Sequence, residues 1–185
     1  EVLDERVCFR QFDGRDLTGF IDGTENPQFP DDRAETALLP EDADEFVDGS
    51  FIFAQRYAHN LEKWKKLKVD AQEQVIGRTK LESIELDDDV QPNNSHVSRT
   101  VVEDDEGEEM AILRHSLPYG DGKGDQGLFF IAYTNDLSII DSMLLRMFGT
   151  SGDGIHDRLL HFVTPKDGAY YFAPSEELLE TILES

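Results

Sequence analysis

The pattern of apolar and polar positions predicts three strands and one long helix. Residues 50–57 (SFIFAQRY) and 127–134 (GLFFIAYT) are apolar runs of strand length next to glycine, and residues 169–174 (AYYFAP) form a third such run. In residues 137–148 (LSIIDSMLLRMF) the apolar positions recur at helical spacing, and Asp136 is a start signal. These four segments are expected to supply most of the core.

Weaker signals cover the rest of the chain. Residues 61–67 and 70–80 are expected to form short helices, the second with Asp70 as its N-cap. Residues 97–102 (VSRTVV) and 111–117 (AILRHSL) flank an acidic turn that contains a glycine, which predicts paired strands. We also expect acidic loops at 28–49 and 81–94, a short helix within 156–162, and a terminal helix capped by Ser175.

The strong elements occur in the order strand, helices, strand, strand, helix, strand. This is the β-α-β-β-α-β order of a ferredoxin-like α+β domain, in which helices cover one face of an antiparallel sheet. The other face of the sheet would then need a cover, from a ligand, another domain or a partner.

Charge narrows the range of partners and the setting. The 185 residues carry 17 Lys and Arg against 40 Asp and Glu, a net charge of −23, which disfavours nucleic acid and anionic membranes as partners. The acids are dispersed along the chain, as expected of a halophilic protein whose self-repulsion is screened by salt. One cysteine, no secretory signal and no apolar run of membrane length predict a reducing, cytoplasmic location.

Three residues stand out as candidates for chemistry. Asp22, in GFIDGTENP, is either the cap of a turn or an acid held at the edge of the core to meet a ligand. His96 follows a loop in PNNSHVSR, from which it can be directed inward, and no histidine pair has the i, i+4 zinc spacing. Arg114, in AILRHSLPYG, either snorkels at a sheet edge or meets a polar ligand.

Five motifs in a fixed order carry a family resemblance: GFIDGTENP, VIGRTK, P-x-x-S-H, ILRHSLPYG and HDRLL. Together they make the chain similar to the dye-decolorizing peroxidases, most closely the bacterial B-type, over essentially its whole length. The resemblance implies a fold of the dimeric α+β barrel superfamily. It implies a distal heme segment and acidic loop at 1–49 and a ferredoxin-like heme-binding domain at 50–185, with the family's N-terminal ferredoxin-like domain absent.

The same resemblance assigns roles to individual residues. It implies heme b as cofactor, His96 as the proximal iron ligand, and Asp157 as the carboxylate that accepts a hydrogen bond from that histidine. Asp22 would be the distal acid/base and Arg114 the cation beside it, and an aspartate as base predicts that dye oxidation favours acid pH. Further cofactor contacts are expected from Gly23, Thr24, Glu25, Asn26, Arg78 and Ser116.

The implied activity is oxidation of dyes, phenols or other one-electron donors by hydrogen peroxide. Two alternatives stay open: a heme-binding or heme-handling protein without peroxidase turnover, and an acidic metal-binding interaction domain without heme. Glu25 could bind Mn²⁺, and the expected partner is a second copy or a separate N-terminal-domain chain. Electrons from bulky dyes could pass through one of the aromatic residues Tyr57, Trp64, Tyr119, Tyr133, Tyr170 and Tyr171.

Overall fold

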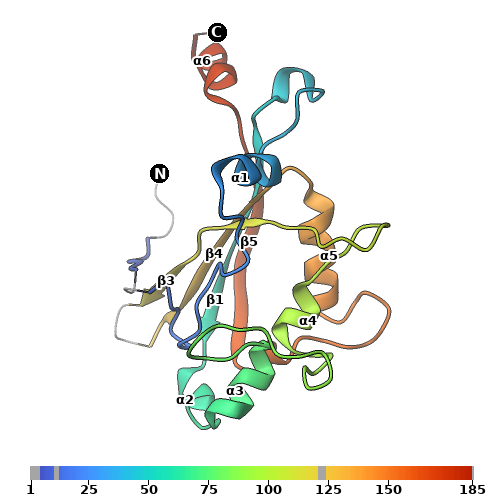
Figure 1. Ribbon diagram of the computed structural model, residues 1–185. Coiled ribbons are helices and arrows are strands. Elements are labelled where there is room, and N and C mark those ends of the chain that lie inside the picture. Colours follow the sequence, from blue (N-terminus) through green and yellow to red (C-terminus); the bar gives the residue numbers. More distant parts are fainter. Residues whose placement is uncertain (1–4, 11–12, 121–123, 185) are drawn as a thin grey trace.

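The computed structural model describes residues 5–10, 13–120 and 124–184, which form an antiparallel sheet with helices beside it (Figure 1). The long strands are β1 (Ser50–His59), β4 (Gln126–Thr134) and β5 (Val163–Ala173). Two short strands, β2 (Leu113–Arg114) and β3 (Leu117–Gly120), both pair with β4. The sheet order is β2-β4-β1-β5, which confirms the predicted ferredoxin-like topology.

Strand register fixes which side chains face the helices. Phe53 lies opposite Ala132 and Tyr57 opposite Leu128 in the β1–β4 pair, so these side chains share one face of the sheet. Gly127 is required in this pair, because a Cβ atom there would lie 1.8 Å from the backbone oxygen of Tyr57.

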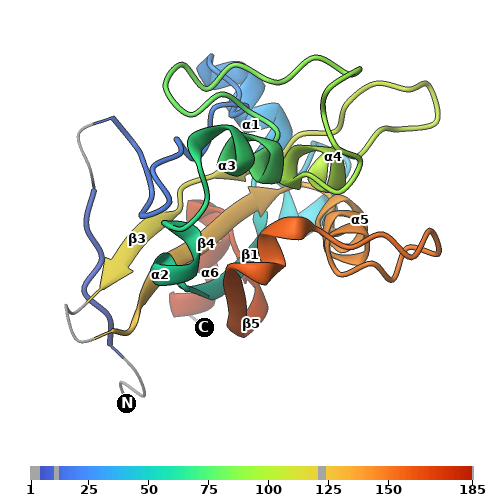
Figure 2. The ribbon, with the colours of Figure 1, turned by 90° about the horizontal axis from the view of Figure 1, so that it is seen from below.

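The helices that matter for the site lie on one side of the sheet (Figure 2). They are α3 (Val69–Ile76), α4 (His96–Thr100) and α5 (Leu137–Met147), and a 3₁₀ turn, η2 (Arg158–His161), precedes β5. The remaining elements are α1 (Pro30–Ala37), η1 (Asp44–Phe46), α2 (Leu61–Trp64) and α6 (Glu176–Glu184). Helix α6 projects beyond the end of the sheet (Figure 1), and its Ser175 Oγ accepts from the Leu178 N–H at 3.3 Å, as a cap should.

Three predictions of local structure were wrong. Residues 97–102 do not form a strand, because Ser95 caps a short helix by accepting from the Ser98 N–H at 3.2 Å, and that bond outweighs the β-branched composition. The segment 28–49 is not all loop: it contains α1, with Pro30 in the first turn, and η1.

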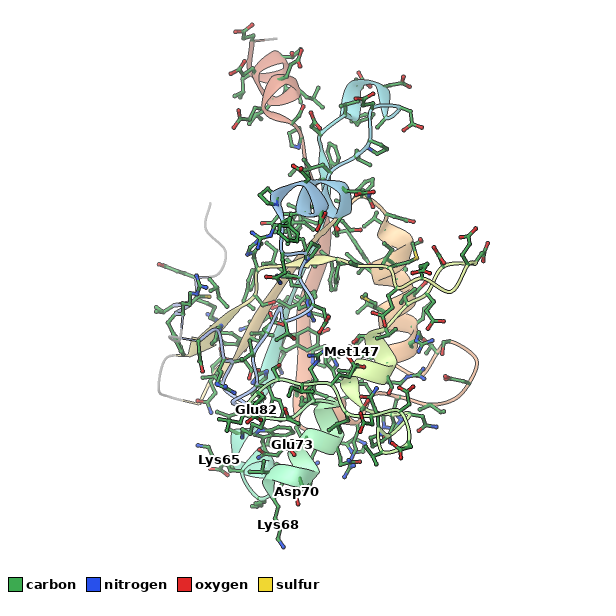
Figure 3. The ribbon with its side chains drawn as sticks, viewed as in Figure 1. Lys65, Lys68, Asp70, Glu73, Glu82 and Met147 are labelled. Atoms are coloured by element: carbon green, nitrogen blue, oxygen red, sulfur yellow. The ribbon has the colours of Figure 1, made fainter. Side chains whose placement is uncertain are left out.

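Asp70 is not the N-cap of α3. It lies in the first turn, after the extended residue Lys68, where its charge favours the helix dipole without a capping bond. It belongs to a charged end of the molecule around α2 and α3 that also carries Lys65 (Figure 3).

In the described residues, the buried apolar side chains form three clusters. The first contains Phe20 and Trp64, whose rings meet edge to face at 6.1 Å, and it fixes the GFIDG segment against α2 and α3. The indole N–H of Trp64 donates to the backbone carbonyl oxygen of Thr18 at 2.9 Å. The other two clusters pack α5 on the sheet, around Phe53 and around Met147. Within the described parts of the chain, no helix is long and apolar enough to cross a membrane.

Candidate functional site

A cavity of about 320 Å³ lies between the helix-covered face of the sheet and helices α4 and α5. Its volume falls within the roughly 300–1,000 Å³ range of small-molecule sites. The walls are mostly apolar and come from strands, helices and the GFIDG segment; they include Phe20, Phe53, Ile76, Ile112, Phe130, Ile140, Met143 and Leu144. A few polar side chains therefore define its chemistry.

His96 is the polar group on the helical side. Its Nδ1 lies 2.6 Å from Oδ2 of Asp157, a carboxylate with no solvent exposure. A carboxylate oxygen accepts here, so the histidine Nδ1 donates, and in the neutral imidazole this leaves the lone pair on Nε2. The arrangement is that of a metal-ligating histidine oriented by a carboxylate.

Asp157 is itself held rigidly. Its other oxygen, Oδ1, accepts from the Leu159 N–H at 2.7 Å and so caps η2, while its own N–H donates to the Met147 oxygen at 2.8 Å. The next N–H, of Arg158, donates to the Asn94 oxygen at 2.9 Å. These bonds connect the loop before β5 to α5 and to the segment before α4, and they fix the distance from the carboxylate to His96.

Arg99, on α4, also connects this helix to α5 and to the loop that follows α5. Its guanidinium is buried, and it donates to the Arg146 oxygen at 3.0 Å and pairs with Asp153 at 2.8 Å. Hydrogen bonds from the Ile155 N–H and from Arg99 lower the pKa of Asp153 to about 2. A permanently charged pair therefore fastens α4 to the loop that carries Asp157.

Asp22, from the GFIDG segment, and Arg114, from β2, form a second polar group in the lining of the cavity. Arg114 Nη1 lies 3.8 Å from Asp22 Oδ1, and each side chain is about one-fifth exposed (21% and 22%). Asn26 sets the arginine backbone, since its Nδ2 donates to the Arg114 oxygen at 2.7 Å and its Oδ1 accepts from the Arg114 N–H at 2.9 Å. Gly23, at φ +76°, makes room for that amide, which a Cβ would approach to 2.9 Å.

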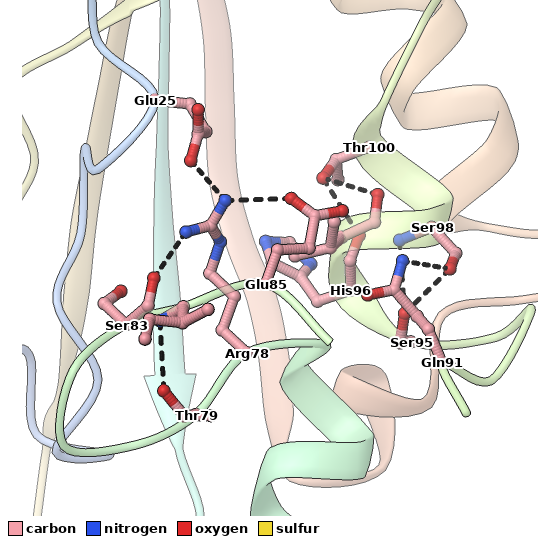
Figure 4. A network of polar contacts seen from close by, with 12 residues as sticks. Glu25, Arg78, Thr79, Ser83, Glu85, Gln91, Ser95, His96, Ser98 and Thr100 are labelled. Atoms are coloured by element: carbon pink, nitrogen blue, oxygen red, sulfur yellow. Dashed lines mark hydrogen bonds and ion pairs between the residues drawn. The ribbon is translucent and has the colours of Figure 1, made fainter. Parts of the chain in front are cut away.

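Arg78 occupies the rim of the cavity with two acidic partners (Figure 4). Its Nη2 pairs with Glu25 and, at 2.9 Å, with Glu85, while Nη1 donates to the Ser83 oxygen at 2.6 Å. The side chain is only 11% exposed. The rim therefore carries a largely buried cation paired with two more exposed carboxylates.

The structure brings most of the predicted site residues together. Those that line the cavity are Asp22, Thr24, Glu25, Arg78, His96 and Arg114. Asp157 lies behind His96, and Gly23 and Asn26 lie behind Arg114, where they position other residues. Ser116 is not among the lining residues, and its buried Oγ has no hydrogen-bond partner in the described residues.

The lining residues that the sequence analysis missed include two whose pKa is shifted by burial, His59 and Asp16. Burial lowers the pKa of His59 to about 4, so this imidazole is neutral at pH 7. Burial raises the pKa of Asp16 from 3.8 to about 6, against the opposing effect of two hydrogen bonds from Thr18. Strand alternation could have found His59, because it has the same parity on β1 as Phe53 and Tyr57.

No cluster suited to a metal ion bound by protein side chains alone is present in the part of the chain that the structure describes: no group there has three or more histidine, cysteine or acidic ligands. Glu25 is engaged by Arg78. The cavity is therefore lined by two histidines, of which His96 has a carboxylate partner, and by the acid–cation pair of Asp22 and Arg114.

Comparison with known proteins shows which family the chain belongs to. The model of the family "Dyp-type peroxidase, C-terminal" matches residues 13–178. The chain belongs to the Dyp-type peroxidase family. It is 44% identical over 180 residues to the dye-decolorizing peroxidase of Mycobacterium tuberculosis, a match that covers 97% of this chain and 53% of the relative.

Solved structures agree with this membership in the family. The chain superposes on DyPB from Rhodococcus jostii RHA1 with a TM-score of 0.93 at 46% identity, covering 98% of this chain and 58% of that one. For the dye-decolorizing protein from V. cholerae the TM-score is 0.90 at 49% identity, with 98% and 59% covered. The chain thus spans about half the length of the curated relatives it matches, and it corresponds to their C-terminal half.

Proposed function

We propose that the cavity binds heme b and that the protein is a peroxidase, which uses hydrogen peroxide to oxidise dyes, phenols or other one-electron donors. The observation that carries the proposal is that one apolar cavity is lined by His96, with Asp157 on its Nδ1 at 2.6 Å, and by the pair of Asp22 and Arg114. In support, a variant of Rhodococcus jostii DypB that is 46% identical to this chain was solved in complex with heme.

The residues present fit heme. A porphyrin is a flat apolar ring, which suits walls of Phe, Ile, Leu and Met, and its iron needs an axial nitrogen, which His96 Nε2 can supply. Its two propionates are anionic, and Arg78 lies at the rim to meet one of them. Because Arg78 already holds Glu25 and Glu85, a propionate would displace one of these carboxylates.

Bound heme would supply the redox-active iron at which peroxide is cleaved and from which donors are oxidised. Cleavage of the O–O bond requires a proton to move from one peroxide oxygen to the other. Asp22 can take that proton on a carboxylate oxygen and return it, which is general acid–base catalysis by one positioned group. Arg114, within 3.8 Å of Asp22, holds a fixed positive charge where negative charge develops on the departing oxygen.

Asp157 determines how His96 acts. By accepting a hydrogen bond, the buried carboxylate keeps the proton on Nδ1 of His96 and fixes the orientation of the ring. It also raises the basicity of Nε2. A ligand of increased basicity favours the oxidised states of iron that peroxidase turnover requires.

The proposal is tested by peroxide-dependent oxidation of a small phenol by the heme-loaded protein. Asp22→Asn is isosteric and removes only the base, so turnover is expected to fall by about 10²–10⁴-fold while heme stays bound. Arg114→Leu should also lose turnover. If Asp22→Asn retains wild-type turnover across acid pH, the assigned acid–base role is wrong. If wild type binds heme without turnover, the alternative of a heme-binding or heme-handling protein stands.

We also infer how donors too large for the cavity are oxidised. Tyr170 is 44% exposed, its hydroxyl donates to Asp141 Oδ1 at 2.6 Å, and its ring lies 5.0 Å from that of Phe53, which lines the cavity. Oxidation of a tyrosine releases its phenolic proton, and Asp141 is placed to accept it. Tyr57, by contrast, is buried, and among the described residues its hydroxyl contacts the sulfur of Met147 at 4.0 Å and no carboxylate.

The setting of the protein is also a proposal. The division at residues 49 and 50 fits a site whose distal acid comes from the first segment and whose ligand comes from the second. A second copy or a chain with the family's N-terminal half would cover the face opposite the helices, where Tyr171 is 58% exposed. If the protein sediments as a monomer, both alone and when mixed with a chain of that N-terminal half, the proposed partner is wrong.

We place the protein in the cytoplasm of a salt-adapted cell. The net charge of −23 supports the salt adaptation, because self-repulsion falls as the Debye length shortens from about 10 Å at 0.1 M salt to about 3 Å at 1 M. The melting temperature should therefore rise between these salt concentrations, and an unchanged value would refute the inference.

A further inference from the structure

Two histidines on the outer side of the η2 turn point their rings at each other. His156 and His161 have Nε2 atoms 3.1 Å apart, with ring centroids at 5.2 Å and planes tilted by 51°. Both residues are exposed. Asp157, between them in the sequence, points the other way, to His96. The pair is thus outside the cavity and has no part in the proposed peroxidase chemistry.

The backbone on each side of the pair is fixed. Next to His156, the Asp157 N–H donates to the Met147 oxygen at 2.8 Å, and Gly149 packs against the His156 backbone closely enough that a Cβ would lie 3.2 Å from its nitrogen. At the other end, Lys63 Nζ donates to the His161 oxygen at 2.9 Å. The backbone of both residues is therefore held, which limits how far apart the two imidazoles can move.

We propose that His156 and His161 form a binding site for a divalent transition metal such as Zn²⁺. With Zn–N bonds of about 2.05 Å, two nitrogens 3.1 Å apart subtend an angle of about 98° at the metal, between octahedral and tetrahedral values. Imidazole selects this class of ion over Mg²⁺ and Ca²⁺. Water completes the coordination, since Asp153, the acid nearest in sequence on the preceding loop, is paired with Arg99.

The competing interpretation is a plain hydrogen bond, in which one neutral imidazole donates to the other. The two differ in a measurable way, because a hydrogen-bonded pair takes up no metal. Non-specific uptake by the 40 acidic residues has to be suppressed, and excess magnesium chloride in molar potassium chloride does this, since Mg²⁺ competes for carboxylates and not for imidazole.

Equilibrium dialysis of the heme-loaded protein against zinc sulfate under these conditions tests the proposal. Wild type should bind one zinc per chain, and either His156→Gln or His161→Gln should weaken binding by at least about tenfold, because a two-ligand site becomes a single imidazole. His115→Gln, at an exposed histidine on the sheet, should change nothing.

Circular dichroism would check that the variants keep their fold. Absence of magnesium-resistant zinc in wild type, or equal binding by wild type and both variants, would show that the pair is a hydrogen bond only. Dialysis does not depend on turnover, so failure of the peroxidase proposal would leave this result interpretable.

Discussion

Replacing Asp157 by Asn would change the hydrogen bonding of His96 at constant shape. In wild type one carboxylate oxygen accepts from His96 Nδ1 at 2.6 Å and the other from the Leu159 N–H at 2.7 Å. An amide has a single acceptor oxygen. If that oxygen keeps the bond to Leu159, the amide NH₂ faces His96, the histidine proton moves to Nε2, and the nitrogen that would ligate iron is blocked.

The magnitude follows from the burial of the pair. Hydrogen bonds to charged groups contribute about 1.5–3 kcal/mol, and loss of such a partner behind a metal-ligating histidine weakens metal binding or activity by about 10–100-fold. Asp157 has no solvent exposure, so water cannot replace it, and we expect the upper part of this range.

The assay is a heme titration of Asp157→Asn followed by absorbance, together with the reduction potential of the bound iron, which should rise when the anionic partner is lost. Asp167→Asn, at a surface carboxylate whose side chain is 86% exposed, is the charge control. Equal heme affinity and equal potential in Asp157→Asn and wild type would refute the role given to this carboxylate.

Three further predictions concern pH, packing and electron transfer. Because burial raises the pKa of Asp16 from 3.8 to about 6, wild type should lose stability relative to Asp16→Asn as pH rises from about 4 to about 6, by about 3 kcal/mol at most, in urea unfolding of the heme-free protein; parallel curves would contradict this. Gly127→Ala should cost more than about 4 kcal/mol or prevent folding, because its Cβ would overlap the Tyr57 oxygen, and a normal urea midpoint would show the register to be wrong. Tyr170→Phe should slow oxidation of a bulky dye and leave a small phenol unaffected, whereas Tyr171→Phe, on the other face, should change neither; equal dye rates in all three proteins would exclude the Tyr170 route.

Much of the fold could be predicted from the sequence because its signals are local. The apolar runs of β1 and β4 and the capped periodicity of α5 each fit one type of element, and their order gave the topology. The short helix α4 could not be predicted this way. Its β-branched residues favour a strand. The cap from Ser95 is a local signal for a helix, but the burial of Arg99 depends on tertiary contacts.

The site, like the fold, could be predicted only in part from the sequence. Asp22, His96 and Arg114 were identified through motifs, and the structure brings them to one cavity. The ion pairs of Arg78 could not be inferred, since Glu25 lies 53 residues before it and Glu85 is brought back to it by the fold of the loop after α3. His59 was missed because the predicted strand ended at Tyr57, whereas β1 continues to His59.

His59 also provides the most direct test of the central claim, because it and His96 are both histidines that line the cavity. The measurement is heme binding by His96→Ala and His59→Phe, with electron paramagnetic resonance of the ferric protein to identify the axial ligand. If His96 is the axial ligand, His96→Ala should lose heme, or recover it only with added imidazole. His59→Phe should keep a histidine-ligated signal. Retention of that signal in His96→Ala, with its loss in His59→Phe, would contradict this assignment.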